Sequence, residues 1–219
     1  MNEIDEETFF EKWKDACEGK KEKDLVTNWK DTNMYSYLIL GEKGLKKKNF
    51  KNIERKINDL SDKKSVVELL LKSMKKNIDK NLDLHQEYYS ADVVYYSKID
   101  NISKKSVLLN HIVIHLEHEN IIDKSLEEIA QLQIIPGDLD VLVTYPNYSF
   151  IEDGKIKEQL NKYKESMNEK FDKKLLIIFG FLDDTNSSKK TVTWKGYKFN
   201  TDNKTSQKEF VPLSLENIF

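Results

Sequence analysis

Several residue types and motifs that would point to particular functions are scarce or missing in this chain of 219 residues. A single cysteine, Cys17, excludes an internal disulfide bond and a zinc site built from cysteines. Arg55 is the only arginine, which leaves little scope for the paired hydrogen bonds through which arginine recognises guanine. No apolar run approaches the roughly 18 residues that a membrane helix needs, and the acidic N-terminus has no apolar signal core. We therefore expect a cytoplasmic protein.

Two kinds of enzyme motif are also missing. The sequence has no glycine-rich phosphate loop, which argues against an NTP-binding enzyme. It has no G-x-S-x-G nucleophile elbow, so a Ser-His-Asp hydrolase is not indicated. What is present is a highly charged chain, with 34% charged and 38% hydrophobic residues and a net charge of −2, as expected of a globular protein. This length is enough for one sizeable core, with or without a helical appendage.

The hydrophobic pattern changes near residue 80. Before that point apolar residues such as Phe9 and Trp13 recur at helical spacing. After it, short apolar runs alternate with amphipathic segments, which predicts strands and helices in turn and a parallel section of sheet. We therefore expect an α/β fold, a mixed central sheet flanked by helices. A helical N-terminal region at residues 1–80 would pack on an α/β core at residues 81–219, which ends in a hairpin.

Individual elements follow from the same pattern. The expected strands are residues 91–96, 107–119, 139–145 and 175–180, with residues 191–199 as a strand or as a hairpin around Lys195-Gly196, and residues 209–213 as its partner. The expected helices of the core are residues 126–132, capped by Asp123 or Ser125, and residues 156–171. Residues 175–180 are fully apolar, which predicts a strand covered on both faces.

The most informative stretch is residues 112–120, IVIHLEHEN, which begins as a buried strand and ends in acidic residues. Successive side chains on a strand point to opposite faces, so His111, Val113, His115, Glu117 and Glu119 share one face. Two carboxylates on a buried face are costly without a counter-charge. The counter-charge that suits such oxygen ligands is Mg²⁺ or Mn²⁺. The stretch therefore predicts a divalent metal site.

A third acidic residue, Asp92, begins the strand expected at residues 91–96. If this strand pairs with the one at 107–119 as a hairpin, Asp92 lies near Glu117. Glu87 stands a few residues upstream. Three acids around a divalent cation suit the hydrolysis of a phosphodiester, because the cation polarises the phosphate and lowers the pKa of a bound water. We expect Asp92 and Glu117 to bind the metal and Glu119 to orient or deprotonate the water, with Glu87 supporting a second metal.

These residues carry a resemblance to a known family. A strand-borne Asp92, a strand ending in Glu117-x-Glu119, a helix and a further strand resemble the PD-(D/E)xK, or restriction-endonuclease-like, nuclease superfamily over about residues 63 to 182. Glu119 stands where the family usually has lysine, and Ala91 stands where it has proline. The resemblance implies an Mg²⁺- or Mn²⁺-dependent endonuclease whose partner is DNA. A homodimer is compatible with this activity, since nucleases that cut both strands are often symmetric dimers.

Four further residues are candidates for contacts around the metal or the substrate. They are His115, His118, Asn120 and Lys124, the last as a substitute for the missing lysine of the motif. Three other interpretations stay open. In the first, the acids have no function and stand at strand ends simply because these meet water. In the second, the chain has a nuclease fold that binds without cutting. In the third, His111, His115 and Glu117 hold zinc, although their spacing is neither HExxH nor HxxEH.

A cluster of lysines at residues 43–56 allows two interpretations. Charged runs usually form a solvated surface, and lysines also neutralise the phosphates of nucleic acids. We favour the solvated surface and keep contact with phosphates as the alternative.

Overall fold

The structure is a computed structural model that describes residues 4–18, 20–42, 47–60, 62–88, 91–97, 111–135, 137–146, 154–168, 171–183, 190–201 and 208–213. For residues 20, 47–50, 87, 88 and 201 it describes the backbone alone. In these parts of the chain, no helix is long and apolar enough to cross a membrane.

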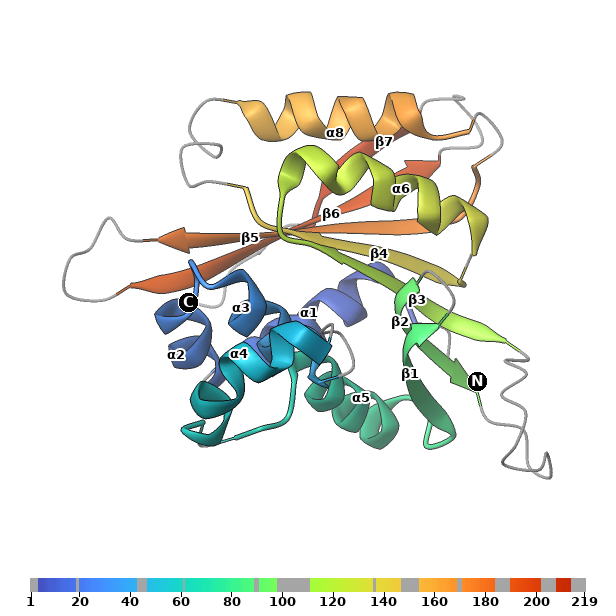
Figure 1. Ribbon diagram of the computed structural model, residues 1–219. Coiled ribbons are helices and arrows are strands. Elements are labelled where there is room, and N and C mark those ends of the chain that lie inside the picture. The colour runs from blue at the N-terminus through green and yellow to red at the C-terminus, as the bar shows by residue number, and fades with distance from the viewer. Residues whose placement is uncertain are drawn as a thin grey trace, which may run out of the picture.

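A single seven-stranded mixed sheet forms the centre of the protein (Figure 1). Its strands are β1 (Leu82–Tyr88), β2 (Ala91–Ser97), β3 (Ile112–Glu119), β4 (Leu139–Thr144), β5 (Lys174–Asp183), β6 (Thr191–Thr201) and β7 (Lys208–Pro212). They lie side by side in chain order. The pairs β3–β4 and β4–β5 are parallel, and all other pairs are antiparallel. The expected α/β class with a parallel section of mixed sheet is confirmed.

Helices cover both faces of this sheet. They are α1 (Glu6–Cys17), α2 (Lys20–Thr27), α3 (Thr32–Leu40), α4 (Lys47–Asn58), α5 (Val66–Asn77), α6 (Ser125–Ile134) and α8 (Lys155–Ser166), with a 3₁₀ turn, η2 (Ile122–Lys124), before α6. Figure 1 shows α1 to α5 below the sheet and α6 and α8 above it. The α6 and α8 helices provide the two crossovers between the parallel strands, one for each connection.

Each face of the sheet has its own hydrophobic core, because side chains alternate along every strand. On the side of α1 to α5, residues such as Leu116, Val141 and Ile178 pack against the helices. On the side of α6 and α8, residues such as Leu142 and Ile177 do so. The central strands β4 and β5 are therefore buried on both faces, as the fully apolar sequence of residues 175–180 predicts for β5.

The sequence predicted most elements and missed some details. Residues 82–88 form a strand, β1, that the weak alternation of LDLHQEY did not reveal. Residues 191–201 are one continuous strand without a turn at Lys195-Gly196, so that alternative is wrong, whereas the pairing with residues 208–212 is confirmed. The helix expected at 156–171 ends at Ser166. Residues 107–110 of the expected third strand lie outside the described residues.

Candidate active site

Asp92 and Glu117 come together at the pairing of β2 with β3. These strands are antiparallel, with Val93 opposite Leu116. The Asp92 backbone N–H donates to Glu117 Oε2 at 3.2 Å, and the His118 backbone N–H donates to Asp92 Oδ2 at 2.9 Å. Each carboxylate is thus held by the backbone of the other strand. The proximity expected of Asp92 and Glu117 from the sequence is present in the structure.

The carboxyl group of Glu117 lies on the face of the sheet covered by α6. In the parallel register Glu117 is the neighbour of Leu142, which packs in the core under α6 and α8. Glu117 is only 1% exposed, whereas Asp92 and Glu119 are half-buried. Burial raises the pKa of Glu117 to about 8, even though the hydrogen bond from the Asp92 backbone lowers it. Burial therefore favours the protonated form of Glu117 in the folded protein when no cation is bound.

His115 is the hydrogen-bond partner of that proton. Its Nε2 lies 2.8 Å from Glu117 Oε1, and its Nδ1 lies 2.5 Å from the carbonyl oxygen of Ile135. A carbonyl only accepts, so Nδ1 carries the hydrogen of a neutral ring and Nε2 is left as an acceptor. Burial lowers the pKa of His115, which favours this neutral ring. The two partners thus form a neutral hydrogen bond in which the Glu117 carboxyl group donates.

A further carboxylate, Glu128, reaches the same region from α6. Burial raises its pKa to about 7, and the next contributions come from the negative charges of Glu117, Asp92 and Glu119, in that order. A carboxyl group responds in this way only when other carboxylates are near. Four acidic residues from β2, β3 and α6 therefore share one electrostatic environment.

The floor of this region holds two more buried polar residues from β4. Asp140 is the register neighbour of His115, and its Oδ1 accepts from the Gly137 backbone N–H at 2.8 Å and lies 4.0 Å from His115 Nδ1. Burial raises the pKa of Asp140 to about 7. Thr144 is the register neighbour of Glu119. Among the described residues, neither Asp140 Oδ2 nor the Thr144 hydroxyl has a hydrogen-bond partner.

Sequence analysis missed Glu128 and Asp140, and each left a signal. Glu128 occupies the i+3 position after buried Ser125 and the i−4 position before buried Leu132, so it stands on the buried face of α6 where an apolar residue is expected. Asp140 is an acidic residue inside a strand whose residues are all buried.

The other residues predicted from the sequence lie around the acidic pair or away from it. Glu119 Oε1 accepts from the Ile121 backbone N–H at 2.7 Å, which holds it at the end of β3. The Asn120 amide donates to the Ser36 hydroxyl of α3 at 2.9 Å, so it ties the end of β3 to the helical layer. Lys124 is exposed at the start of α6. Glu87 lies in β1, and its side chain is outside the described residues.

The histidines do not converge on one point. His111 Nε2 lies 2.8 Å from Asp138 Oδ1 at an exposed site, whereas His115 is buried against Glu117. The His118 ring points to the opposite face of the sheet, where it lies 5.2 Å from the Tyr145 ring and burial lowers its pKa to about 3. This separation speaks against the histidine-based zinc site. It also places the His118 side chain away from the acidic group.

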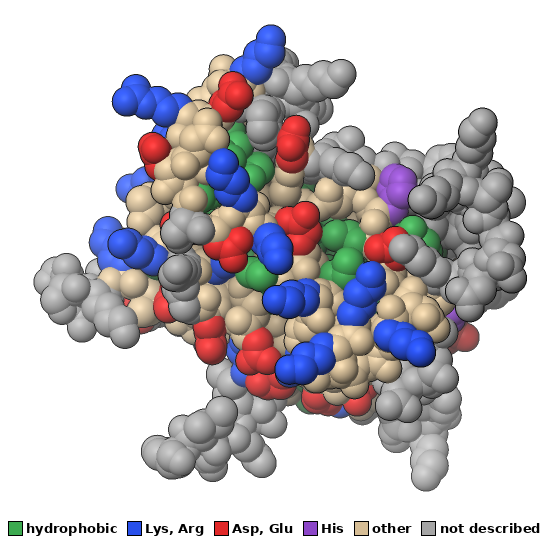
Figure 2. All heavy atoms as spheres, turned by 90° about the horizontal axis from the view of Figure 1, so that it is seen from below, with side chains coloured by type: hydrophobic (Ala, Val, Ile, Leu, Met, Phe, Trp, Pro, Cys, Tyr) green, Lys and Arg blue, Asp and Glu red, His purple; other side chains and the backbone are tan. Residues whose placement is uncertain are grey.

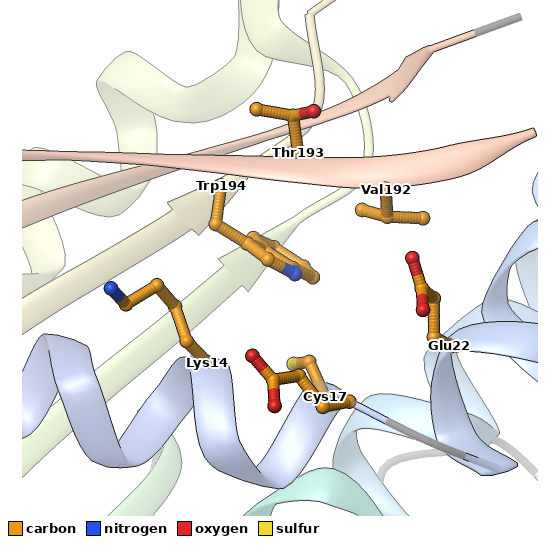
Figure 3. Close-up of a pocket in the computed structure, with 7 residues that line it drawn as sticks. Lys14, Cys17, Glu22, Val192, Thr193 and Trp194 are labelled. Carbon is orange, nitrogen blue, oxygen red and sulfur yellow. The ribbon is translucent and has the colours of Figure 1, made fainter. Parts of the chain in front are cut away.

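A separate pocket of about 360 Å³ lies on the α1–α5 side of the sheet. Figure 3 shows Val192 and Trp194 projecting from β6 toward Cys17 at the end of α1 and Glu22 of α2. This pocket contains none of the acidic residues described above, so it is distinct from the candidate active site.

In the described parts of the chain, no three His, Cys, Asp or Glu side chains are arranged closely enough to hold a metal ion as they stand. Glu117 is engaged with His115, and Glu119 with the backbone of Ile121. Comparison with protein-family models, curated proteins and solved structures gave no match to this chain.

Proposed function

We propose that this protein is a divalent-metal-dependent nuclease that hydrolyses phosphodiester bonds, with DNA as the substrate. The observation that carries the proposal is the meeting of Asp92 with Glu117 on neighbouring strands, beside Glu119 and the Glu128 of α6. The order of these elements, an acidic strand, a Glu-x-Glu strand, a helix and a parallel strand, also resembles the restriction-endonuclease-like superfamily.

The chemistry of the donor set fits Mg²⁺ or Mn²⁺, which prefer carboxylate oxygens. Burial is the leading cause of the raised pKa values of Glu117 and Glu128, and the other raising contributions to Glu128 are carboxylates rather than counter-charges. Bringing such groups to their anionic form requires a cation in their midst. The orphaned hydroxyl of Thr144 next to Glu119 adds a further oxygen at the same place.

Each residue has a distinct role in this proposal. Asp92 and Glu117 hold the cation, and Glu128 joins them from α6. A bound divalent cation supplies polarisation of the scissile phosphate and a water of lowered pKa. Glu119 orients this water or accepts its proton, and Glu87 supports a second ion. His115 sets the orientation of Glu117 through their hydrogen bond.

The second candidate is a catalytically inactive nuclease fold that only binds or assembles with a partner. The engagement of Glu117 with His115 in a neutral hydrogen bond favours this alternative, because a carboxyl group that stays protonated holds no metal. The active nuclease and the inactive binding protein would have the same fold, but only the nuclease would bind a divalent cation.

Calorimetric titration with Mn²⁺ separates these candidates. Asp92→Asn and Glu117→Gln keep the shape and a hydrogen-bond acceptor at each position while removing the charge, so both variants should fold and lose the heat of binding. The matched control is Glu127→Gln, because Glu127 is the exposed neighbour of Glu128 on α6. It should bind Mn²⁺ as the wild type does.

Cleavage is then assayed on plasmid, linear duplex and single-stranded DNA with Mg²⁺ or Mn²⁺. The proposal expects cleavage by the wild type and by Glu127→Gln, and none by Glu117→Gln. A Glu117→Gln protein that cuts as fast as the wild type would show that the reaction does not use this site. Equal Mn²⁺ heats from wild type and Asp92→Asn would remove Asp92 from the ligand set.

A further inference from the structure

The lysines of the sequence are distributed very unevenly along the chain. Residues 43–80 contain thirteen lysine or arginine residues against five acidic ones, a net charge of +8 in a chain whose total is −2. The rest of the protein is therefore strongly acidic. Most of this positive segment forms α4 and α5, and both helices pack against α3.

The apolar faces of these helices turn inward and leave the basic residues outside. Among the side chains of α4 that the structure describes, those of Ile53 and Ile57 are buried, and in α5 the buried residues include Leu70 and Met74. The exposed basic residues of the described part of this segment are Lys51, Arg55, Lys56, Lys63, Lys64, Lys72, Lys76 and Lys80, here called the basic surface. Figure 2 views the molecule from below and shows Lys and Arg side chains standing across this side, with Asp and Glu between them.

Four members of the basic surface form like-charged pairs along the two helices. Lys51 and Arg55 are four residues apart on α4, and Lys72 and Lys76 are four residues apart on α5. Like charges at this spacing repel one another and destabilise a helix. Within the described residues none of these four side chains has an ion-pair partner. An anionic partner would relieve the repulsion.

Acidic residues nearby are already engaged in local structure or pair with other lysines. Asp31 pairs with Lys56 at 2.5 Å, and Asp83 lies 3.8 Å from Lys75. The Glu68 carboxylate accepts hydrogen bonds from the backbone and hydroxyl of Ser65 as part of the capping box of α5. Glu54 and Asp59 are also exposed among these lysines, but basic residues outnumber acidic ones in residues 43–80 by eight, so the outward charge of this layer stays positive.

We infer that the basic surface of α4 and α5 binds the phosphate backbone of duplex DNA, apart from the acidic site. Charge complementarity carries this inference, since lysines that neutralise phosphates supply most of the sequence-independent affinity for DNA. The inference deepens the proposed nuclease function by assigning the substrate an anchoring surface. Because α4 and α5 cover the face of the sheet opposite to α6, this anchor and the acidic cluster lie on different sides of the molecule (Figure 1).

The separation of the basic surface from the acidic site predicts that one binds DNA and the other acts on it. The basic surface would hold DNA without regard to its sequence, because lysine contacts to phosphates carry no base information. The acidic site would then act on a different portion of the same molecule. Binding should therefore be independent of metal and of Glu117, which allows it to be tested whether or not the protein cuts DNA.

The test uses the full chain in EDTA and a fluorescent 30-base-pair duplex of mixed sequence, with affinity measured by anisotropy between 50 and 250 mM salt. The variant replaces Lys51, Arg55, Lys72 and Lys76 by Gln. A matched control replaces four exposed lysines of α8, on the other side of the sheet, by Gln: Lys155, Lys157, Lys162 and Lys164. Circular dichroism confirms that both variants are folded, since all eight side chains are on the surface.

Each phosphate contact contributes roughly 0.9 to the slope of log affinity against log salt for duplex DNA. Loss of four contacts should reduce the magnitude of this slope by about 3.6 and weaken binding at low salt at least tenfold, while the α8 control binds as the wild type does. No binding by the wild type, unchanged binding by the α4–α5 variant, or an equal loss in the α8 control would each overturn the inference. Binding of phosphatidylserine vesicles, but not of DNA, through the same lysines would overturn the assignment to nucleic acid.

Discussion

Replacement of Glu117 by Gln should stabilise the metal-free protein at high pH. Glu117 has an ordinary pKa of 4.5 in the unfolded chain, and burial raises it to about 8 in the folded protein. Between these values the folded state holds a proton that the unfolded state has released. The free energy of unfolding therefore falls as the pH rises from about 4.5 to about 8. Glutamine imitates the protonated carboxyl group and never ionises, so it removes this penalty.

The size of the effect follows from the same shift. One pKa unit corresponds to about 1.36 kcal/mol, so the loss for Glu117 amounts to roughly 4–5 kcal/mol by pH 8. This is a large share of the roughly 5–15 kcal/mol by which a typical domain is stable. At pH 5 the wild type and Glu117→Gln should agree within about 1 kcal/mol, and at pH 8 the variant should be more stable by about 4 kcal/mol.

Urea unfolding in EDTA from pH 5 to pH 9 measures this difference. Trp13 and Trp194 are both buried, so fluorescence reports the loss of the core. The control, Glu127→Gln, changes an exposed residue and should alter stability by less than about 0.5 kcal/mol at every pH. A pH slope that survives in Glu117→Gln is expected from Asp140 and Glu128, since burial raises the pKa of each to about 7.

A Glu117→Gln variant that is less stable than the wild type would refute this account of Glu117. If Glu117 and His115 formed an ion pair instead of a neutral hydrogen bond, the variant would be less stable than the wild type at pH 7, because a buried imidazolium would lose its partner. Addition of Mn²⁺ at pH 8 provides an independent check. It should stabilise the wild type through binding and leave Glu117→Gln unchanged.

Three other substitutions test the surroundings of the site and the packing of the sheet. His115→Gln removes the residue that orients Glu117 and should weaken Mn²⁺ binding by roughly 10- to 100-fold in calorimetry, while the affinity for duplex DNA in EDTA stays that of the wild type. Gly180→Ala should destabilise the protein by about 1–3 kcal/mol in urea, because a Cβ atom there would lie 2.7 Å from the Trp194 ring. Ser65→Ala breaks the capping box of α5 and should cost about 1 kcal/mol by the same measurement. Unchanged unfolding midpoints in the last two would contradict the packing described.

Local patterns were sufficient for the class of fold and for the main acidic pair. The apolar run around Ile177 predicted a strand covered on both faces, because such a strand needs apolar residues at every position. The acidic Asp92 and Glu117 stood out because charge is costly next to such runs. The weak strand β1 was missed, since an edge strand with mixed polarity leaves little periodic signal.

The partners of the acidic pair required the three-dimensional structure. Glu128 reaches the site because the crossover helix α6 lies across β3 and β4, and Asp140 because β4 is parallel to β3 in a register that places it beside His115. The sequence shows which residues of a helix share a face, but not where the helix lies on the sheet or which strand residues that face contacts. It also does not show the register between two parallel strands.

The sequence by itself determined the alternation of strands and helices, the two faces of β3, and the concentration of lysine in residues 43–80. These properties depend on neighbours within a few positions, so they are visible in one dimension. Tertiary structure alone decided that Glu117 is buried against His115, that Asn120 donates to Ser36 of α3, and that the basic surface lies across the sheet from the acids. Burial and long-range pairing set these properties, because the free energy of a charge depends on the groups that surround it in space.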